Sequence, residues 1–283
     1  AAELPAVPPK KKGKRKAVEE KSIPAETPPK TKGKGKGKKD APPTRFPSAE
    51  TVAPVTVSGK KKGRSSRGLL RVIPLGGLGE VGKNMTLLET ARDIIIVDCG
   101  MGFPDEEMPG IDLVIPDVSY LEANKEKIRG MLLTHGHEDH IGGLPYLLSK
   151  VNAPIYGTRL TVGLIENKLR EHSLDHVSLF AVDAGSHVKL GCFDVELIHV
   201  NHSIPDSVGV AIHSPAGTVV HTGDFKIDCT PMSGGMIDLS RFAQLGDKGV
   251  LALMADSTNA SRPGFTATEQ TVADSFDTLF RRA

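Results

Sequence analysis

Short apolar runs separated by turn residues make up most of the chain from Leu69 onward. Runs of this length predict strands, and they fall at 85–89, 94–97, 131–133, 179–182, 188–190, 195–199, 208–212, 219–220 and 250–254. The run at 85–89 alternates between apolar and polar side chains, as half-buried strands do, whereas 94–97 is an uninterrupted apolar block. The pattern therefore predicts a protein rich in short strands.

Apolar positions at helical spacing predict three helices. One spans 160–169, with Leu160, Leu164, Ile165 and Leu169 on one face, and one follows the run at 131–133 and covers 141–148. The third begins at a capping-box pattern, Thr266–Glu269, and its apolar stripe consists of Val272, Phe276, Leu279 and Phe280. Strands, a helix or two, and strands again suit an α/β sandwich of two sheets flanked by helices.

Composition divides the chain near residue 68. Residues 1–68 hold 19 Lys and Arg against 6 Asp and Glu, a formal charge of +13, whereas residues 69–283 carry −11. The first part is also rich in Pro and cannot bury enough apolar surface to fold, so it predicts a disordered basic tail. Such a tail suits contact with RNA phosphates through counterion release; the alternative is a solvated tail that aids solubility.

Cysteine usage and hydropathy indicate the compartment. Cys99, Cys192 and Cys229 are an odd number without CxxC spacing, so no disulfide framework is expected. No apolar run approaches the roughly 18 residues of a membrane span, and the start of the chain has no apolar signal segment. These features predict a cytoplasmic protein without membrane attachment.

The densest chemistry of the chain follows the apolar run at 131–133. Four potential metal ligands lie within six residues there: His135, His137, Asp139 and His140. Imidazole and carboxylate suit zinc and similar divalent ions. His135 and His137, two residues apart in extended backbone, can grip one ion, and Asp139 with His140 can reach a second. The alternative is a polar loop that happens to contain several histidines.

This HxHxDH pattern resembles the motif of the metallo-β-lactamase superfamily. Three more segments, 76–84, 202–207 and 256–259, are similar to the ribonuclease J family of the β-CASP branch, which processes nucleic acids. The similarity runs from about Leu69 to the last residue. It implies an αββα sandwich over 69–268 and the start of a β-CASP domain at 269–283, where the chain stops within that insertion.

The resemblance also implies further site residues. His202 and Asp224 match metal-binding positions, with Asp224 bridging two ions. Asp98 is implied as a carboxylate that orients the metal-binding loop, and Asp256 as a proton donor. His199 and His221 are expected to pack or form hydrogen bonds beside the ligands.

The expected function is zinc-dependent hydrolysis of RNA phosphodiesters, with two Zn²⁺ per site and Mn²⁺ as an alternative. A hydroxide held by the two ions would attack phosphorus. The resemblance implies 5′–3′ exonuclease and endonuclease activity in RNA maturation and decay, including rRNA processing. It also implies a homodimer or homotetramer and association with other RNA-decay proteins. Because a last ligand of the second metal and the 5′-phosphate pocket would lie beyond residue 283, the 283-residue chain alone is expected to bind metal weakly and to show little nuclease activity.

A second motif suggests a nucleotide cofactor, but its context excludes one. Gly77, Gly79 and Gly82 fit GxGxxG, which in a dinucleotide site opens a helix. Here a predicted strand follows at 85–89. We expect a glycine-rich turn near the active-site rim instead.

Other functions stay open. A thioesterase or lactonase of the same fold would share the ligands without needing the 256–259 segment or a basic tail. A non-catalytic RNA-binding scaffold would have lost ligands, yet all six readable positions are intact. A flavo-diiron redox protein is disfavoured, because that branch typically carries Glu where His137 stands.

Overall fold

The computed structural model describes residues 68–174 and 176–283. The predicted basic tail at 1–68 lies outside these residues except for Gly68, so it stays a prediction. No helix within the described ranges is long and apolar enough to cross a membrane.

The first sheet contains strands from the first half of the described chain. They are β1 (Arg71–Gly76), β2 (Met85–Glu89), β3 (Ile94–Val97), β4 (Ile128–Leu132), β5 (Ile155–Gly157) and β6 (Leu179–Ala181), arranged in that order. The pairs β1–β2 and β2–β3 are antiparallel, whereas β3 to β6 run parallel. The parallel strands therefore all end at one edge of the sheet, where ligands of α/β proteins commonly bind.

The second sheet follows in the sequence. Its strands are β7 (His187–Leu190), β8 (Phe193–His199), β9 (Val208–Ser214), β10 (Gly217–His221) and β11 (Ala252–Met254), in the order β11-β10-β9-β8-β7. All neighbours are antiparallel except β10 and β11. Because β10 and β11 are parallel, the residues that follow them leave the sheet at the same end.

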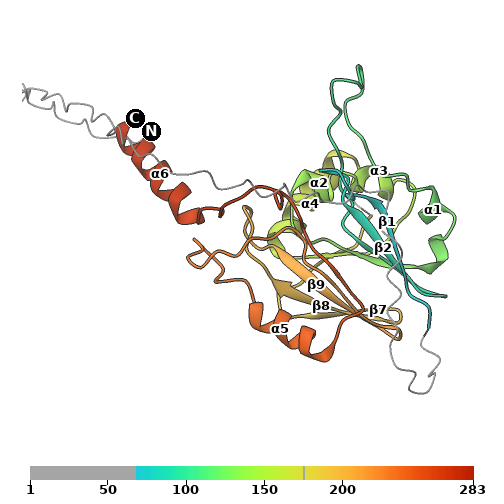
Figure 1. The fold of residues 1–283 in the computed structure, drawn as a ribbon. Helices are drawn as coiled ribbons and strands as arrows, with labels where there is room; N and C mark the ends of the chain where they lie inside the picture. The colour runs from blue at the N-terminus through green and yellow to red at the C-terminus, as the bar shows by residue number, and fades with distance from the viewer. Residues whose placement is uncertain (1–67, 175) are drawn as a thin grey trace, which may run out of the picture. The chain divides into compact units, whose positions relative to one another are not determined.

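Helices cover the outer faces of the sheets (Figure 1). The first sheet carries α1 (Ser119–Glu122), the 3₁₀ turn η2 (Lys125–Lys127), α2 (Glu138–Ile141), α3 (Leu144–Leu148) and α4 (Arg159–Glu171). The second sheet carries α5 (Leu239–Lys248), and α6 (Glu269–Arg282) ends the chain. The predicted sandwich of two sheets between helices is confirmed.

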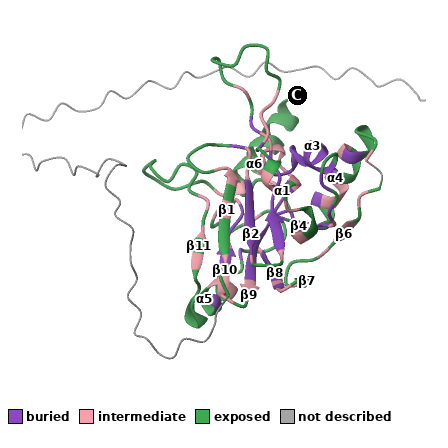
Figure 2. Ribbon diagram, turned by 90° about the vertical axis from the view of Figure 1, so that its right-hand side faces the viewer, coloured by how far each residue is buried: buried purple, intermediate pink, exposed green. Residues whose placement is uncertain are grey.

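Three apolar clusters hold these layers together. Between the sheets, Leu88, Ile95 and Leu132 pack against Val195, Val210 and other residues of the second sheet. On the outer face of the first sheet, Leu87 and Ile96 pack against α1 to α4. A smaller cluster, Ile198, Ala211, Val220 and Leu245 with Phe242, seats α5. Figure 2 shows this burial concentrated in the strands.

Strand β2 forms where the sequence predicts a strand, and it is buried on both faces. All five of its residues are buried, including Thr86 and Glu89. The strand lies between β1 and β3 with both faces covered, so Leu87 and Leu88 enter different clusters. The Glu89 carboxylate is compensated by Tyr120 Oη at 2.6 Å and by Lys127 Nζ at 3.3 Å.

The predicted helices form, with two corrections. The helix expected at 141–148 is two short helices, α2 and α3, interrupted at Gly142-Gly143. Helix α6 begins later than its capping-box pattern indicated: its N-cap is Thr268, not Thr266, and the Thr268 side chain accepts a hydrogen bond from Gln270 N. Strands β1 and β5 and helix α5 were not predicted. The boundary proposed between 268 and 269 stays a prediction.

Candidate metal centre

The histidine-rich turn follows β4 at the shared end of the parallel strands. His135 and His137 lie in the extended segment after the strand, and His137 caps α2, which carries Asp139 and His140. His135 and His140 are buried, whereas His137 and Asp139 are partly exposed. The chain thus passes from an apolar strand to a short helix within five residues. The histidine and aspartate side chains of this turn lie at the carboxyl end of the parallel strands.

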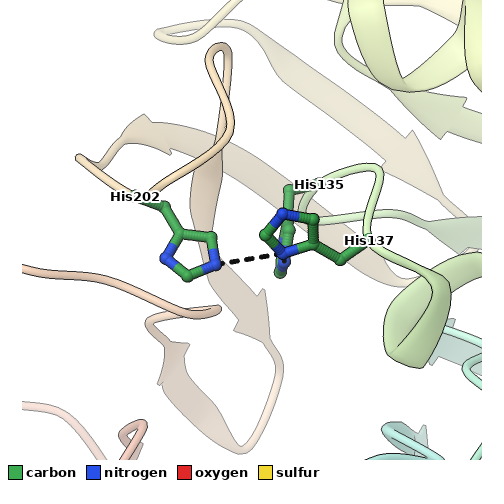
Figure 3. A group of neighbouring side chains, drawn as sticks. All are labelled: His135, His137 and His202. Carbon is green, nitrogen blue, oxygen red and sulfur yellow. Dashed lines mark hydrogen bonds between the residues drawn. The ribbon is translucent and has the colours of Figure 1, made fainter. Parts of the chain in front are cut away.

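Three imidazole nitrogens converge at this mouth. His137 Nδ1 lies 3.1 Å from His135 Nε2 and 3.2 Å from His202 Nε2 (Figure 3). Nitrogens bound to one tetrahedral zinc ion lie about 3.3 Å apart, given Zn–N distances near 2.0–2.1 Å. The spacing therefore fits a three-histidine metal site with one position open.

The protonation states of two of these histidines also suit metal binding. Burial, followed by the charge of His140, lowers the pKa of His135 to about 3. Burial likewise lowers the pKa of His202, although Asp224 opposes this shift. Both rings are therefore neutral near pH 7, the form in which imidazole binds a metal ion.

A second group adjoins the first. Ligand atoms of His135, His140 and Asp224 all lie within 4.8 Å of one another. Asp224 Oδ1 is 3.4 Å from His140 Nε2, and Asp224 Oδ2 is 3.7 Å from His202 Nε2. Asp224 thus faces one histidine of each group, the arrangement required of a carboxylate shared between two ions.

Electrostatics in the second group favour a cation. Burial alone would lower the pKa of His140, but Asp98 and Asp224 raise it to about 10. Burial would raise the pKa of Asp224, but the hydrogen bond and charge of His140 bring it to about 2. A metal ion at Nε2 could take the place of the proton that these carboxylates stabilise.

Asp98 lies behind the ligands. It follows β3, is 1% exposed, and adopts φ of 60°. Its Oδ1 accepts a hydrogen bond from Thr134 N at 2.8 Å, and its Oδ2 lies 2.8 Å from both Thr134 Oγ1 and His140 Nδ1. Burial would raise the pKa of Asp98, but the charge and hydrogen bond of His140 outweigh it and hold the pKa below its usual range. These contacts make Asp98 an anchor for the turn.

Backbone hydrogen bonds fix the ligand turn from the side. Cys99 N donates to His140 O at 2.8 Å, and Met101 N donates to Glu138 O at 3.1 Å. Asn84 donates to Asp139 O from its backbone and from its side chain, each at 3.1 Å. The glycine-rich segment before β2 thus ends at the ligand turn, where Asn84 is hydrogen-bonded to Asp139 O.

His202 and Asp224 come from loops of the second sheet, after β8 and β10. The two loops are bridged, since Lys226 N donates to Asn201 O at 2.8 Å. The Asn201 side chain also binds Gly235 O and Ile237 N at 2.8 and 2.9 Å. This buried side chain therefore joins the loop after β8 to the loop between β10 and α5, beside His202.

Besides Asp98, two more predicted site residues, Asp139 and Asp256, lie outside both groups of three within the described residues. Asp139 Oδ2 is 3.7 Å from His140 Nε2, at the edge of the second group. Asp256 follows β11, where its backbone N–H donates to Thr222 Oγ1 and its Oδ1 accepts from Thr258 N at 2.7 Å. It leaves the sheet beside the loop that carries Asp224, because β10 and β11 run parallel.

The other two predicted neighbours form hydrogen bonds. His199 Nε2 lies 3.2 Å from Gly235 O, and His221 Nδ1 accepts from Gly223 N at 3.0 Å. Sequence reasoning missed Thr134, Asn84 and Asn201, although each is adjacent to, or part of, a segment that it had singled out. Their position as polar residues in or beside these segments was the feature of the sequence that could have indicated them.

Known proteins resemble this chain. A family model described as metallo-beta-lactamase superfamily matches residues 78–247. Ribonuclease J of Helicobacter pylori is 47% identical over 225 residues, which is 79% of this chain and 33% of that protein. Ribonuclease J of Thermus thermophilus is 47% identical over 222 residues, which is 76% of this chain and 39% of that protein.

Among solved structures, a protein of unknown function from Enterococcus faecalis V583 overlaps with a TM-score of 0.48 at 16% identity, covering 70% of this chain and 52% of that one. The chain spans about a third of the length of the ribonuclease J relatives that it matches. The matched family model extends over more than half of the residues, from the glycine-rich turn to α5, and includes all the clustered ligands. The chain belongs to the metallo-beta-lactamase superfamily.

Proposed function

We propose that the protein is a metal-dependent ribonuclease that hydrolyses phosphodiester bonds in RNA. The observation that carries this proposal is the pair of adjoining ligand groups that meet at Asp224. The similarity to ribonuclease J at 47% identity supports RNA as the substrate. On this proposal the ligands are His135, His137, Asp139, His140, His202 and Asp224.

Zinc suits the ligand set best. Neutral imidazoles with a few carboxylates are typical of catalytic zinc, and Mn²⁺ also accepts such ligands. The first ion would bind His135, His137 and His202, and the second would bind His140 and Asp139, with Asp224 shared. Bound there, divalent ions lower the pKa of water toward ~7 and offset charge that develops on the phosphoryl oxygens.

The side chains around the ligands contribute orientation and proton transfer. Asp98 holds the His140 ring through Nδ1, so that Nε2 faces the second site. We propose that Asp256 protonates the leaving oxygen of the ribose. Its Oδ1 accepts from Thr258 N, which leaves Oδ2 to carry the proton.

More specifically, we propose that the protein acts as a 5′–3′ exonuclease and an endonuclease in cytoplasmic RNA maturation and decay. We also propose that it forms a homodimer or homotetramer and associates with other RNA-decay proteins. The Lys-rich segment at 1–68 would hold RNA through its phosphates at low salt. A thioesterase or lactonase would use the same ligands, so substrate choice is the decisive property.

The test compares hydrolysis of 5′-monophosphorylated RNA with hydrolysis of a thioester. It uses the 283-residue chain and, in parallel, the complete translation product of its gene. In the complete translation product, His137→Ala should lower RNA cleavage at least about 100-fold, because it removes one nitrogen of the three-histidine group, while RNA binding changes little. His172→Ala, a histidine on an exposed helix end, is the matched control. Thioester hydrolysis without RNA cleavage, or cleavage that survives His137→Ala, would contradict the proposal.

A further inference from the structure

The hydroxyl of Thr134 lies between the buried carboxylate and two ligand rings. Its Oγ1 is 2.8 Å from Asp98 Oδ2, 3.0 Å from His135 Nδ1 and 3.5 Å from His140 Nδ1. Thr134, His135 and Asp98 are all no more than 1% exposed. Because water does not reach these atoms, hydrogen bonds within the protein determine where each proton lies.

The direction of these hydrogen bonds follows from counting donors. Ionised Asp98 can only accept, and a threonine hydroxyl has one proton to donate. Thr134 Oγ1–H therefore donates to Asp98 Oδ2, and the lone pairs of Oγ1 remain for a donor. The neighbour at 3.0 Å is His135 Nδ1, so the proton of the neutral ring lies on Nδ1 and points at Thr134.

His140 is oriented without the Thr134 hydroxyl. Its Nδ1 lies 2.8 Å from Asp98 Oδ2, which is shorter than its 3.5 Å separation from Thr134 Oγ1. Asp98 therefore orients His140 directly. Its hydrogen bonds reach His135 only through the hydroxyl between them, since no Asp98 oxygen is hydrogen-bonded to His135 among the described contacts.

We infer that Thr134 is a positioning residue. Its hydroxyl connects the Asp98 carboxylate to His135 through two hydrogen bonds. These bonds keep the ring proton on Nδ1, so that the Nε2 lone pair faces His137 and His202. The inference rests on the proposed metal centre. In this arrangement one buried carboxylate sets the tautomers of a ligand in each group: His140 by direct contact and His135 through Thr134. The hydroxyl, rather than the bulk of the side chain, carries this role.

Thr134 also has a structural role, which the test must separate from the first. Its backbone N–H donates to Asp98 Oδ1, and its carbonyl accepts from Val208 N at 2.9 Å, joining the two sheets. Thr134→Val keeps these backbone bonds and the side-chain shape and removes only the hydroxyl. Thr134→Ser keeps the hydroxyl and removes the methyl group. Thr161→Val in α4 is the matched control: its buried hydroxyl lies 3.0 Å from Oγ1 of the N-cap residue Thr158 and is hydrogen-bonded to no proposed ligand among the described contacts.

The affinity of each variant for Zn²⁺ is measured by competition with a chromophoric chelator. Groups that orient ligands are worth roughly 10–100-fold in metal affinity. We expect Thr134→Val to lose about that much for the tighter ion, and Thr134→Ser and Thr161→Val to stay within about 3-fold of wild type. Equal affinity of Thr134→Val and wild type, or an equal loss in Thr134→Ser, would overturn the inference.

A second measurement needs no Thr134 variant. Long-range ¹H–¹⁵N NMR of the metal-free wild type, with the His135 signals assigned by their loss in His135→Gln, reports the ring tautomer. The proton is expected on Nδ1, and a majority on Nε2 would overturn the inference even if Thr134→Val failed to fold. If wild-type protein bound no divalent ion, the proposed function would fail and this inference with it. If wild type bound zinc and Thr134→Val bound it equally well, the inference alone would fail.

Discussion

Asp98 is the residue on which most of the ligand turn depends. A non-glycine residue at φ of 60° adopts a sparsely populated conformation, and a fully buried carboxylate is costly unless it is compensated. Three hydrogen-bond donors around its two oxygens supply that compensation. The strained backbone therefore places a charge where it can orient His140 directly.

Replacing Asp98 with Asn tests whether the charge of Asp98 orients His140. The amide keeps the size of the side chain, but only its oxygen can accept hydrogen bonds, whereas both carboxylate oxygens of Asp98 accept them from Thr134 and His140. The His140 ring therefore loses its fixed tautomer. Zinc affinity should fall about 10–100-fold. Isothermal titration of wild type and Asp98→Asn measures the difference. An unchanged affinity would mean that Asp98 serves only the fold.

Single residues also show how far the sequence could predict the site. The HxHxDH motif placed His135 to His140 on one turn, and the resemblance added His202 and Asp224; the structure brings five of these residues into two adjoining groups. Their metal binding stays a prediction. Thr134 and Asn201 had no motif of their own, because their role depends on neighbours that only folding brings near, such as Asp98 and Ile237.

At the level of elements, uninterrupted apolar runs were predictable even when short, whereas elements with sparse or interrupted apolar residues were not. Strand β3 is a block of four buried residues. Strand β1 contains Pro74, which is tolerated because β1 lies at the edge of its sheet. In strand β5, Ile155 and Tyr156 lie between Pro154 and Gly157, two residue types that are depleted in strands, and α5 buries only Leu245. Such elements form through packing on neighbours, which a single sequence does not reveal.

The segment after β3 approaches the ligand turn so closely that only glycine fits. A Cβ at Gly100 would overlap the carbonyl oxygen of Asp139, a backbone atom that cannot swing aside. Gly100→Ala should therefore lower the free energy of unfolding by about 3 kcal/mol and weaken metal binding. Gly163→Ala in α4, where a Cβ meets nothing within 4 Å, should instead raise it by about 0.5–1 kcal/mol. Urea unfolding of both variants checks this, and equal effects would contradict the proposed close approach.

One ion pair adds to the apolar cluster that packs helix α5 on the second sheet. Arg241 Nε and Nη2 donate to Glu196 Oε1 and Oε2 at 2.6 and 2.8 Å, and Glu196 is buried. The hydrogen bond from Arg241 is the main cause that lowers the pKa of Glu196. A lowered carboxyl pKa means that the pair stabilises the fold above the unfolded-state pKa of about 4.3, and that this stabilisation is lost as the pH falls through the folded-state value.

Arg241→Met keeps the apolar stem and removes the charge. At pH 7 it should destabilise the protein by about 1–3 kcal/mol, because Glu196 is left buried without its partner. The difference from wild type should shrink as the pH falls through the lowered folded-state pKa of Glu196, because below it Glu196 is protonated in both proteins. Urea unfolding at several pH values measures it, and a difference independent of pH would refute the ionic account.

At the scale of the whole molecule, the ligands come from both sheets. The ligand turn follows β4 of the first sheet, whereas His202 and Asp224 follow β8 and β10 of the second. An ion bound by all of them would link the two layers, so metal binding should stabilise the folded state. The acidic balance of residues 69–283 favours cations over a bare RNA backbone. On the proposed function, bound ions and the Lys-rich segment at 1–68 would offset this repulsion when RNA approaches.

Metal removal and reconstitution test the central claim most directly. Elemental analysis of the complete gene product, together with RNA hydrolysis before and after dialysis against a chelator, measures bound ions and activity on one sample. The account predicts up to two divalent ions per chain, loss of hydrolysis when they are removed, and recovery when Zn²⁺ or Mn²⁺ is restored. A protein that carries no divalent metal and cleaves RNA equally well in the presence of chelator would contradict it.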